Sequence, residues 1–102
     1  MINMKEIVNR LMAGQIDADL GGGVYKMRTA RTGEGKSSGY RVIVFFKFKE
    51  RVFFTYCFAK AGRANIDQGE LQAFKENAKV NFALTDEQIN ERLRNGTLIE
   101  VI

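Results

Sequence analysis

Residues 19–60 read DLGGGVYKMRTARTGEGKSSGYRVIVFFKFKERVFFTYCFAK, and this stretch decides the fold of the chain. Residues 24–31 of this stretch alternate in character along the chain, which predicts a strand with one face in water. Two later segments are rich in Val, Phe and Tyr, the residues typical of strands. The predicted strands are residues 24–31, 40–48 and 52–59, with Lys49 and Glu50 as the reversal between the last two. They predict an antiparallel meander.

The N-terminal side of this sheet is predicted to carry a helix. Apolar side chains recur at helical spacing over residues 2–13, and Gly14 is a suitable stop. We interpret this apolar face as core packing rather than as a partner-binding surface. Residues 16–23 are predicted to form a turn, because Asp and three consecutive Gly do not sustain a helix. The Gly triplet either supplies positive φ angles before a strand, which we favour, or lets a phosphate approach the backbone.

The C-terminal third is predicted to be mostly helical. Residues 61–67 form a polar connection, and residues 68–79 show helical spacing. Thr85 and Gln88 have the spacing of a capping box, so a second helix should begin there and end at Gly96. Residues 97–102, TLIEVI, are predicted to form a short final strand. We therefore expect residues 1–102 to be a single α+β domain.

Positive charge concentrates in the predicted sheet. The segment from Val24 to Arg63 contains ten Lys or Arg, with only Glu34 and Glu50 as acids, so its net charge is +8 while the rest of the chain sums to −4. A basic centre between acidic flanks favours a polyanionic partner, most plausibly a nucleic acid.

Composition excludes several kinds of chemistry. The chain has 0 His, which removes the commonest general base and metal ligand. With one Cys it cannot build an internal disulfide or a cysteine-rich zinc site. No apolar run is long enough for a membrane helix, and the N-terminus does not resemble a secretory signal. We expect a cytoplasmic protein in which Cys57 is a buried core thiol.

Strand pairing predicts where the basic residues meet. If Phe48 and Arg51 flank the second reversal, Arg41 faces Phe58, and a symmetric first hairpin would place Arg31 opposite Tyr40. A slip of one residue would move each side chain to the other face. The grouping by sheet end is less sensitive to register: one end holds Arg31, Lys36, Tyr40, Arg41, Lys60 and Arg63, and the other holds Lys47, Lys49, Glu50 and Arg51. Clustered cations indicate either a phosphate site or a solvated rim that protects the sheet edge.

A nucleotide P-loop is not indicated, despite a partial match. Residues 30–37, ARTGEGKS, fit a permissive form of that motif. A P-loop must open a helix whose amides bind the phosphates, whereas a strand is predicted after Ser37. We therefore do not expect nucleotide triphosphate binding.

Three motifs together resemble a known family. They are DLGGG at residues 19–23, R-x-A-R-x-G-x-G-K-S-x-G-Y-R at residues 28–41, and F-A-K at residues 58–60. The combination resembles the RelE-like toxins of bacterial type II toxin–antitoxin systems, in particular the HigB-related branch. The resemblance implies a RelE/ParE-like toxin fold, with a curved antiparallel β-sheet packed by helices. It implies an mRNA endoribonuclease that acts on translating ribosomes, and a cognate antitoxin of the helix-turn-helix type.

The resemblance also implies which residues act. Catalytic roles are implied for Lys36, Arg41 and Lys60, and RNA or phosphate contacts for Arg28, Arg31 and Arg63. In such a scheme the RNA 2′-hydroxyl attacks phosphorus, cations stabilise the developing charge, and Lys60 transfers protons if neighbouring cations lower its pKa. Tyr40 either carries a proton, stacks on a base or simply packs. No metal or other cofactor is required.

One alternative of a different class stays open. A non-catalytic binding module of the same fold, either a silenced toxin or a poison resembling a gyrase inhibitor, would carry the same basic surface.

Overall fold

The structure is a computed structural model, and it describes residues 3–29, 39–47, 51–59 and 66–101. A four-stranded antiparallel sheet forms its centre, in the order β1-β2-β3-β4. The strands are β1 (Ala18–Gly21), β2 (Val24–Thr29), β3 (Tyr40–Lys47) and β4 (Arg51–Ala59), and the helices are α1 (Met4–Met12), α2 (Gln68–Phe82) and α3 (Asp86–Arg94). The expected α+β class and the curved antiparallel sheet are confirmed.

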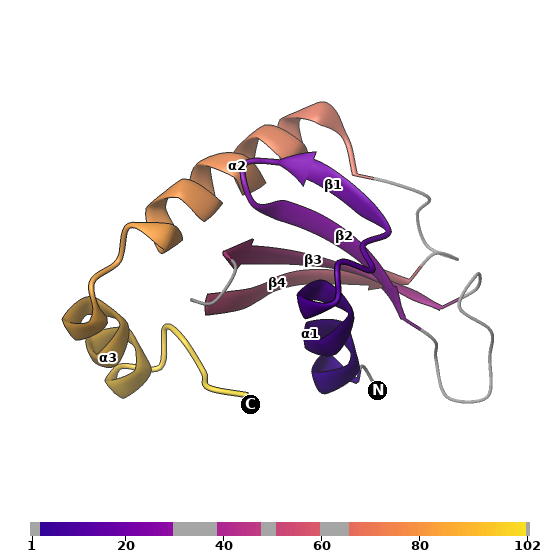
Figure 1. Cartoon of the computed structure of the whole chain (residues 1–102). Coiled ribbons are helices and arrows are strands. Elements are labelled where there is room, and N and C mark those ends of the chain that lie inside the picture. Colours follow the sequence, from indigo (N-terminus) through magenta and orange to yellow (C-terminus); the bar gives the residue numbers. More distant parts are fainter. Residues whose placement is uncertain (1–2, 30–38, 48–50, 60–65, 102) are drawn as a thin grey trace.

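Helices cover the sheet on both faces (Figure 1). On one face, Ile7 and Leu11 of α1 pack against Met27, Val42 and Val44. On the other face, Ala78 of α2 packs in a cluster that also contains the strand residues Val24, Ile43, Phe45 and Phe58. The central strand β3 therefore has apolar side chains on both faces, which explains its continuous hydrophobic run.

The predicted helix boundaries are largely confirmed. Asn3 caps α1 by accepting a hydrogen bond from the Glu6 amide at 3.0 Å, and Gly14 follows the helix with φ +76°. Thr85 and Gln88 form the predicted capping box of α3. A second capping box, made by Asp67 and Glu70, begins α2. The helix α2 extends to Phe82, three residues beyond its predicted end.

Gly22 and Gly23 form the tight turn between β1 and β2, and Gly21, the first glycine of the triplet, ends β1. All three glycines have positive φ, which confirms the favoured interpretation of this segment. Gly23 has a second requirement, because a Cβ there would lie 2.5 Å from a ring carbon of Phe82. The prediction that residues 16–23 form only a turn is wrong, since Ala18–Gly21 pairs with β2 as β1. Asp and Gly have low strand propensity, and pairing with β2 overrides it.

Two further predictions are wrong. Residues 97–101 form no strand; instead the Leu98 amide donates to the Arg92 carbonyl at 3.0 Å and holds this segment beside α3, with Ile99 exposed. Cys57 is exposed rather than buried. Cys57 pairs with Val42 and lies on β4, the edge strand of the sheet. The helix α1 covers Val42 but leaves Cys57 exposed.

The register of the first hairpin differs from the symmetric prediction by two residues. Arg28 pairs with Arg41 and Thr29 with Tyr40, whereas the symmetric closure placed Ala30 and Arg31 at these positions. A two-residue slip preserves the face of every side chain. In the second hairpin, the predicted pair of Arg41 and Phe58 is confirmed, but Arg51 pairs with Lys47 rather than with Phe48, and a register shift between Ile43 and Val44 separates the two parts of the ladder. The reversal at Lys49 and Glu50 and the loop at residues 32–38 lie outside the described residues.

Candidate phosphate-binding site

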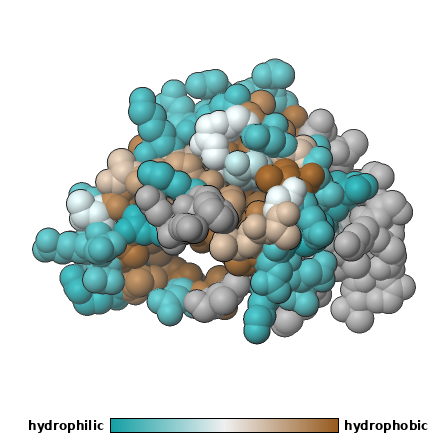
Figure 2. Space-filling view, viewed as in Figure 1, coloured by the Kyte–Doolittle hydropathy of each residue, from teal (hydrophilic) through white to brown (hydrophobic). Residues whose placement is uncertain are grey.

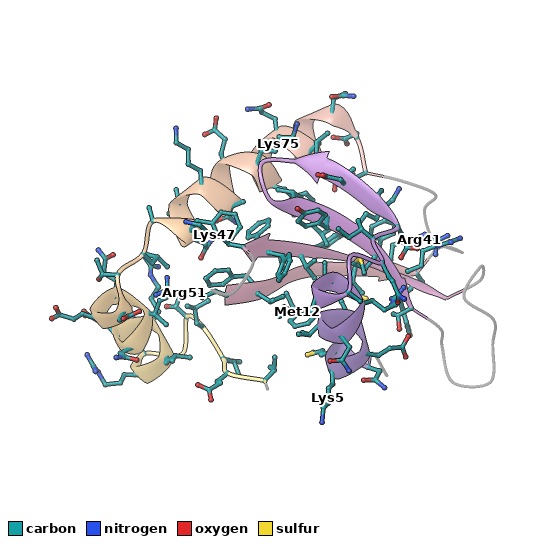
Figure 3. All side chains as sticks on the ribbon, in the orientation of Figure 1. Lys5, Met12, Arg41, Lys47, Arg51 and Lys75 are labelled. Carbon is teal, nitrogen blue, oxygen red and sulfur yellow. The ribbon has the colours of Figure 1, made fainter. Side chains whose placement is uncertain are left out.

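Arg28, Tyr40 and Arg41 lie at one end of the sheet, where β2 ends and β3 begins. Lys47 and Arg51 lie at the opposite end, as the strand pairing predicted (Figure 3). The structure thus confirms the separation of the described basic residues by sheet end. Four predicted site residues, Arg31, Lys36, Lys60 and Arg63, are outside the described residues, and so is most of the polar connection at residues 61–67.

Arg28 and Arg41 lie directly opposite each other on the α2 face of the sheet. The Gly23 carbonyl accepts a hydrogen bond from the Phe46 amide at 2.9 Å. Gly23 and Phe46 are therefore a hydrogen-bonded pair of the β2–β3 ladder. Hydrogen-bonded and non-hydrogen-bonded pairs alternate along an antiparallel ladder, and Arg28–Arg41 lies an odd number of positions from Gly23–Phe46. Arg28 and Arg41 are therefore a pair that exchanges no backbone hydrogen bond. Side chains approach most closely in such pairs, with Cβ atoms about 5 Å apart. The ladder therefore holds two cationic side chains together.

Arg41 is buried without full compensation of its charge. Its exposed fraction is 6%, and its Nη1 atom has no hydrogen-bond partner in the described part of the chain. Leaving a buried donor unsatisfied costs about 1–3 kcal/mol, and more for a charged group. An anion beside Nη1 would remove that cost.

Arg28 has a different environment. Its side chain is 48% exposed, and its Nε lies 3.4 Å from Oδ1 of Asp17. The same carboxylate accepts a hydrogen bond from the Arg28 amide at 2.6 Å and contacts Arg10 at 3.3 Å. Neither Asp17 nor Arg10 is among the site residues expected from the sequence. Neither charge pattern nor motif signals them, because their approach to Arg28 depends on how α1 packs beside β2.

Tyr40 does not share a face with Arg41. It pairs with Thr29, and its neighbours Val42 and Val44 point toward α1. Because side chains alternate along a strand, Tyr40 lies on the α1 face while Arg41 lies on the α2 face. Any contact of Tyr40 with a ligand of Arg41 would have to pass around the end of the sheet.

The opposite end of the sheet holds a structural arginine and a groove. Arg51 donates to the Leu84 carbonyl at 2.8 Å and to Asp86 at 2.5 Å, which ties β4 to the start of α3. A groove of about 980 Å³ lies between the sheet, α1, α3 and the C-terminal segment, and Val8, Phe54 and Leu93 are among its lining residues. Apolar residues are visible in this hollow in Figure 2. Arg41 is not among the residues that line the groove.

No group of three or more potential metal ligands occurs among the residues with described positions. Within the part of the chain that the structure describes, no helix is both long and apolar enough to span a bilayer.

Comparison with known families adds to this geometry. Residues 2–101 match the family described as "RelE toxin of RelE / RelB toxin-antitoxin system", and the chain belongs to this family. The expected RelE-like identity is confirmed, and a toxin of this family pairs with an antitoxin. A closer relation to the HigB branch is not shown. Comparisons with curated proteins and with solved structures gave no match.

Proposed function

We propose that this toxin is a metal-independent endoribonuclease that cleaves mRNA on translating ribosomes in the cytoplasm. The observation that carries the proposal is the pair of Arg28 and Arg41, in which Arg41 is buried with Nη1 unpartnered among the described residues. A buried cation without an anion opposite a second cation is costly unless an anionic ligand completes the arrangement.

The proposed reaction uses the RNA as its own nucleophile. The 2′-hydroxyl loses its proton and attacks the adjacent phosphorus, and the bond to the 5′-oxygen breaks as that oxygen gains a proton. Arg41 stabilises the charge that develops on the phosphorus-bound oxygens, because a preorganised cation acts most strongly where charge forms. Since Nη1 is buried, the substrate must displace the atoms that cover it.

The other assigned residues rest on the sequence. Lys36 contacts the phosphate and Lys60 transfers protons as acid and base, with Arg31 and Arg63 contributing further phosphate contacts. Arg28 supplies the second cation of the described pair. Tyr40 stacks on a base from the other face of the sheet end. No step of this scheme uses a metal ion.

We propose that cleavage takes place on the ribosome because the chain has few side chains suited to proton transfer. The chain has 0 His, so no side chain with an ordinary pKa near neutrality is available as general base. Alignment of the 2′-hydroxyl with the phosphate by the ribosome would supply rate through orientation instead. The proposed antitoxin is a helix-turn-helix protein.

The test is cleavage of a labelled mRNA by the purified protein, with and without translating ribosomes. We expect cuts within codons that leave cyclic phosphate or 3′-phosphate ends. Arg41→Ala should abolish cleavage but keep the fold and antitoxin binding. Arg51→Ala, the same change at the far end of the sheet, should keep cleavage. If the unsubstituted protein arrests growth while mRNA stays intact, the nuclease proposal is wrong.

The alternative class, a non-catalytic binding module of this fold, predicts a different result. Such a protein would bind RNA or a protein target through the same basic surface, and no cyclic phosphate would form at any protein concentration. Product-end analysis therefore distinguishes the two.

A further inference from the structure

The Asp17 carboxylate lies outside the predicted site and contacts three groups at once. Its Oδ2 accepts from the Arg28 amide at 2.6 Å and from Nη1 of Arg10 at 3.3 Å, while Oδ1 lies 3.4 Å from Nε of Arg28. Nη2 of Arg10 also donates to the Arg28 carbonyl. The side chains of Asp17 and Arg10 are 19% and 12% exposed, although Asp17 as a whole residue, with its backbone, is exposed.

These contacts replace a missing strand. β1 begins at Ala18, which pairs with Lys26, so β1 provides no partner for the outward backbone groups of Arg28. Asp17 binds the amide of Arg28 and Arg10 binds its carbonyl. Both outward groups of Arg28 are therefore satisfied by side chains rather than by a ladder. Because Arg10 lies in the last turn of α1, its hydrogen bond to the Arg28 carbonyl also joins that turn to the end of β2.

Asp17 contacts the side chain of Arg28 as well as its backbone amide. Asp17 engages Nε, and neither Nη group of Arg28 meets a carboxylate in the described residues. A guanidinium held at Nε keeps its two Nη groups in a fixed plane, available for bidentate contact with phosphate. The carboxylate also offsets the repulsion between Arg28 and Arg41, which lie opposite each other.

We propose that Asp17 is the positioning residue of the site: it orients Arg28 so that the Arg28 Nη groups and Arg41 contact the same RNA phosphate. This inference rests on the proposed function. It assigns Asp17 a role opposite to that expected from charge alone, because a carboxylate near a phosphate site would otherwise only repel RNA.

Asp17→Asn tests this role, with Asp19→Asn as the matched control. Asp19 is an exposed carboxylate two residues away that accepts a hydrogen bond from the Gly21 amide at 2.9 Å. Both variants raise the net charge by one, so nonspecific electrostatics should strengthen RNA binding equally in both. We expect Asp17→Asn to lower kcat for mRNA cleavage about tenfold or more, because a misplaced phosphate contact is costly. Asp19→Asn should keep kcat or raise kcat/KM slightly.

A double-mutant cycle separates positioning from general stability. Arg28→Gln removes the side chain that Asp17 orients and keeps the backbone that it caps. We expect Asp17→Asn to lower the midpoint of thermal unfolding both in the unsubstituted protein and in the Arg28→Gln background, because it weakens the backbone cap in each. In the Arg28→Gln background it should cause no further loss of kcat. Equal losses of kcat in both backgrounds would overturn the proposal, as would Asp17→Asn activity equal to that of Asp19→Asn.

Binding of an uncleavable RNA, with 2′-deoxy sugars at the scissile position, keeps this test separate from the nuclease proposal. If the unsubstituted protein binds this RNA but cleaves no mRNA, only the nuclease proposal fails. The positioning role is then judged by whether Asp17→Asn weakens binding while Asp19→Asn does not. If the unsubstituted protein neither binds nor cleaves, both proposals are wrong.

Discussion

Arg28 and Arg41 lie opposite each other on β2 and β3, and only one of them has a carboxylate partner in the described structure. Arg28 contacts Asp17, whereas Nη1 of the buried Arg41 has no hydrogen-bond partner among the described residues. Such an asymmetric pair of cations stores electrostatic free energy that a phosphate between them would release.

Replacing Arg41 should separate activity from stability. Arg41→Met keeps much of the side-chain volume and removes the unsatisfied buried donor, so the free energy of unfolding should rise by about 1–3 kcal/mol. The same variant should lose mRNA cleavage. Denaturant unfolding and cleavage assays measure the two effects. A loss of stability comparable to that of a core truncation would show that Arg41 is instead satisfied in the free protein.

Gly23→Ala should be much more damaging than Gly22→Ala. Both positions have positive φ, +82° and +64°, so both substitutions carry a backbone cost of about 1–2 kcal/mol. Only at Gly23 does the new Cβ meet Phe82, at 2.5 Å, and displacing that ring adds about 1–3 kcal/mol. Urea unfolding of both variants checks this prediction. Equal destabilisation would mean that Phe82 moves without cost.

Arg51→Ala should loosen α3 without affecting cleavage. Asp86 is 94% exposed, so its ion pair with Arg51 contributes little. The partly buried hydrogen bond to the Leu84 carbonyl is the larger contribution, and its loss should cost about 1 kcal/mol. Amide hydrogen exchange across α3 should accelerate. Arg94→Ala, at an exposed position of the same helix, should leave exchange unchanged, and similar exchange in both variants would contradict the prediction.

Cys57 should be accessible but slow to react near neutral pH. Partial burial of the Cys57 thiol disfavours its charged form and raises its pKa above the ordinary value, and only the thiolate is nucleophilic. Alkylation by iodoacetamide should therefore accelerate as pH rises and level off only above the ordinary thiol pKa. Cys57→Ser should not react and should still cleave mRNA. Rapid modification near neutral pH, or none at alkaline pH, would contradict this prediction.

Local patterns in the sequence were sufficient for most elements. The β-prone run that begins at Tyr40, the helical spacing before Gly14 and the capping box at Thr85 depend on neighbours a few positions apart. The strand is confirmed over Tyr40–Lys47, and the helix and the capping box are confirmed as well. β1 was missed because its residues have low strand propensity and pair only when β2 is present. The predicted final strand failed because β-prone residues form a strand only where a partner strand is free and adjacent.

For the candidate site too, some features were predicted from the sequence and others became visible only in the structure. Sequence placed Arg41 opposite Phe58 and grouped the basic residues by sheet end. The pair itself depends on an irregularity that the sequence did not predict: Arg51 pairs with Lys47, one residue out of the predicted register, and a shift between Ile43 and Val44 restores the predicted pairs toward Arg41. It did not place Arg28 opposite Arg41, because the sequence separation between Thr29 and Tyr40 is too large for residue type alone to fix the register of their pairing. It gave no sign of Asp17 as a partner of Arg28, because that contact requires α1, β1 and β2 to be assembled.

The sequence by itself determined an antiparallel β meander with flanking helices, a basic sheet end and the absence of histidine chemistry. Each of these follows from residue type and short-range spacing. The tertiary structure alone decided that Arg41 is buried, that Cys57 is exposed and that a carboxylate holds Arg28. Burial and charge pairing depend on which segments cover a strand, and residues far apart in the sequence determine that.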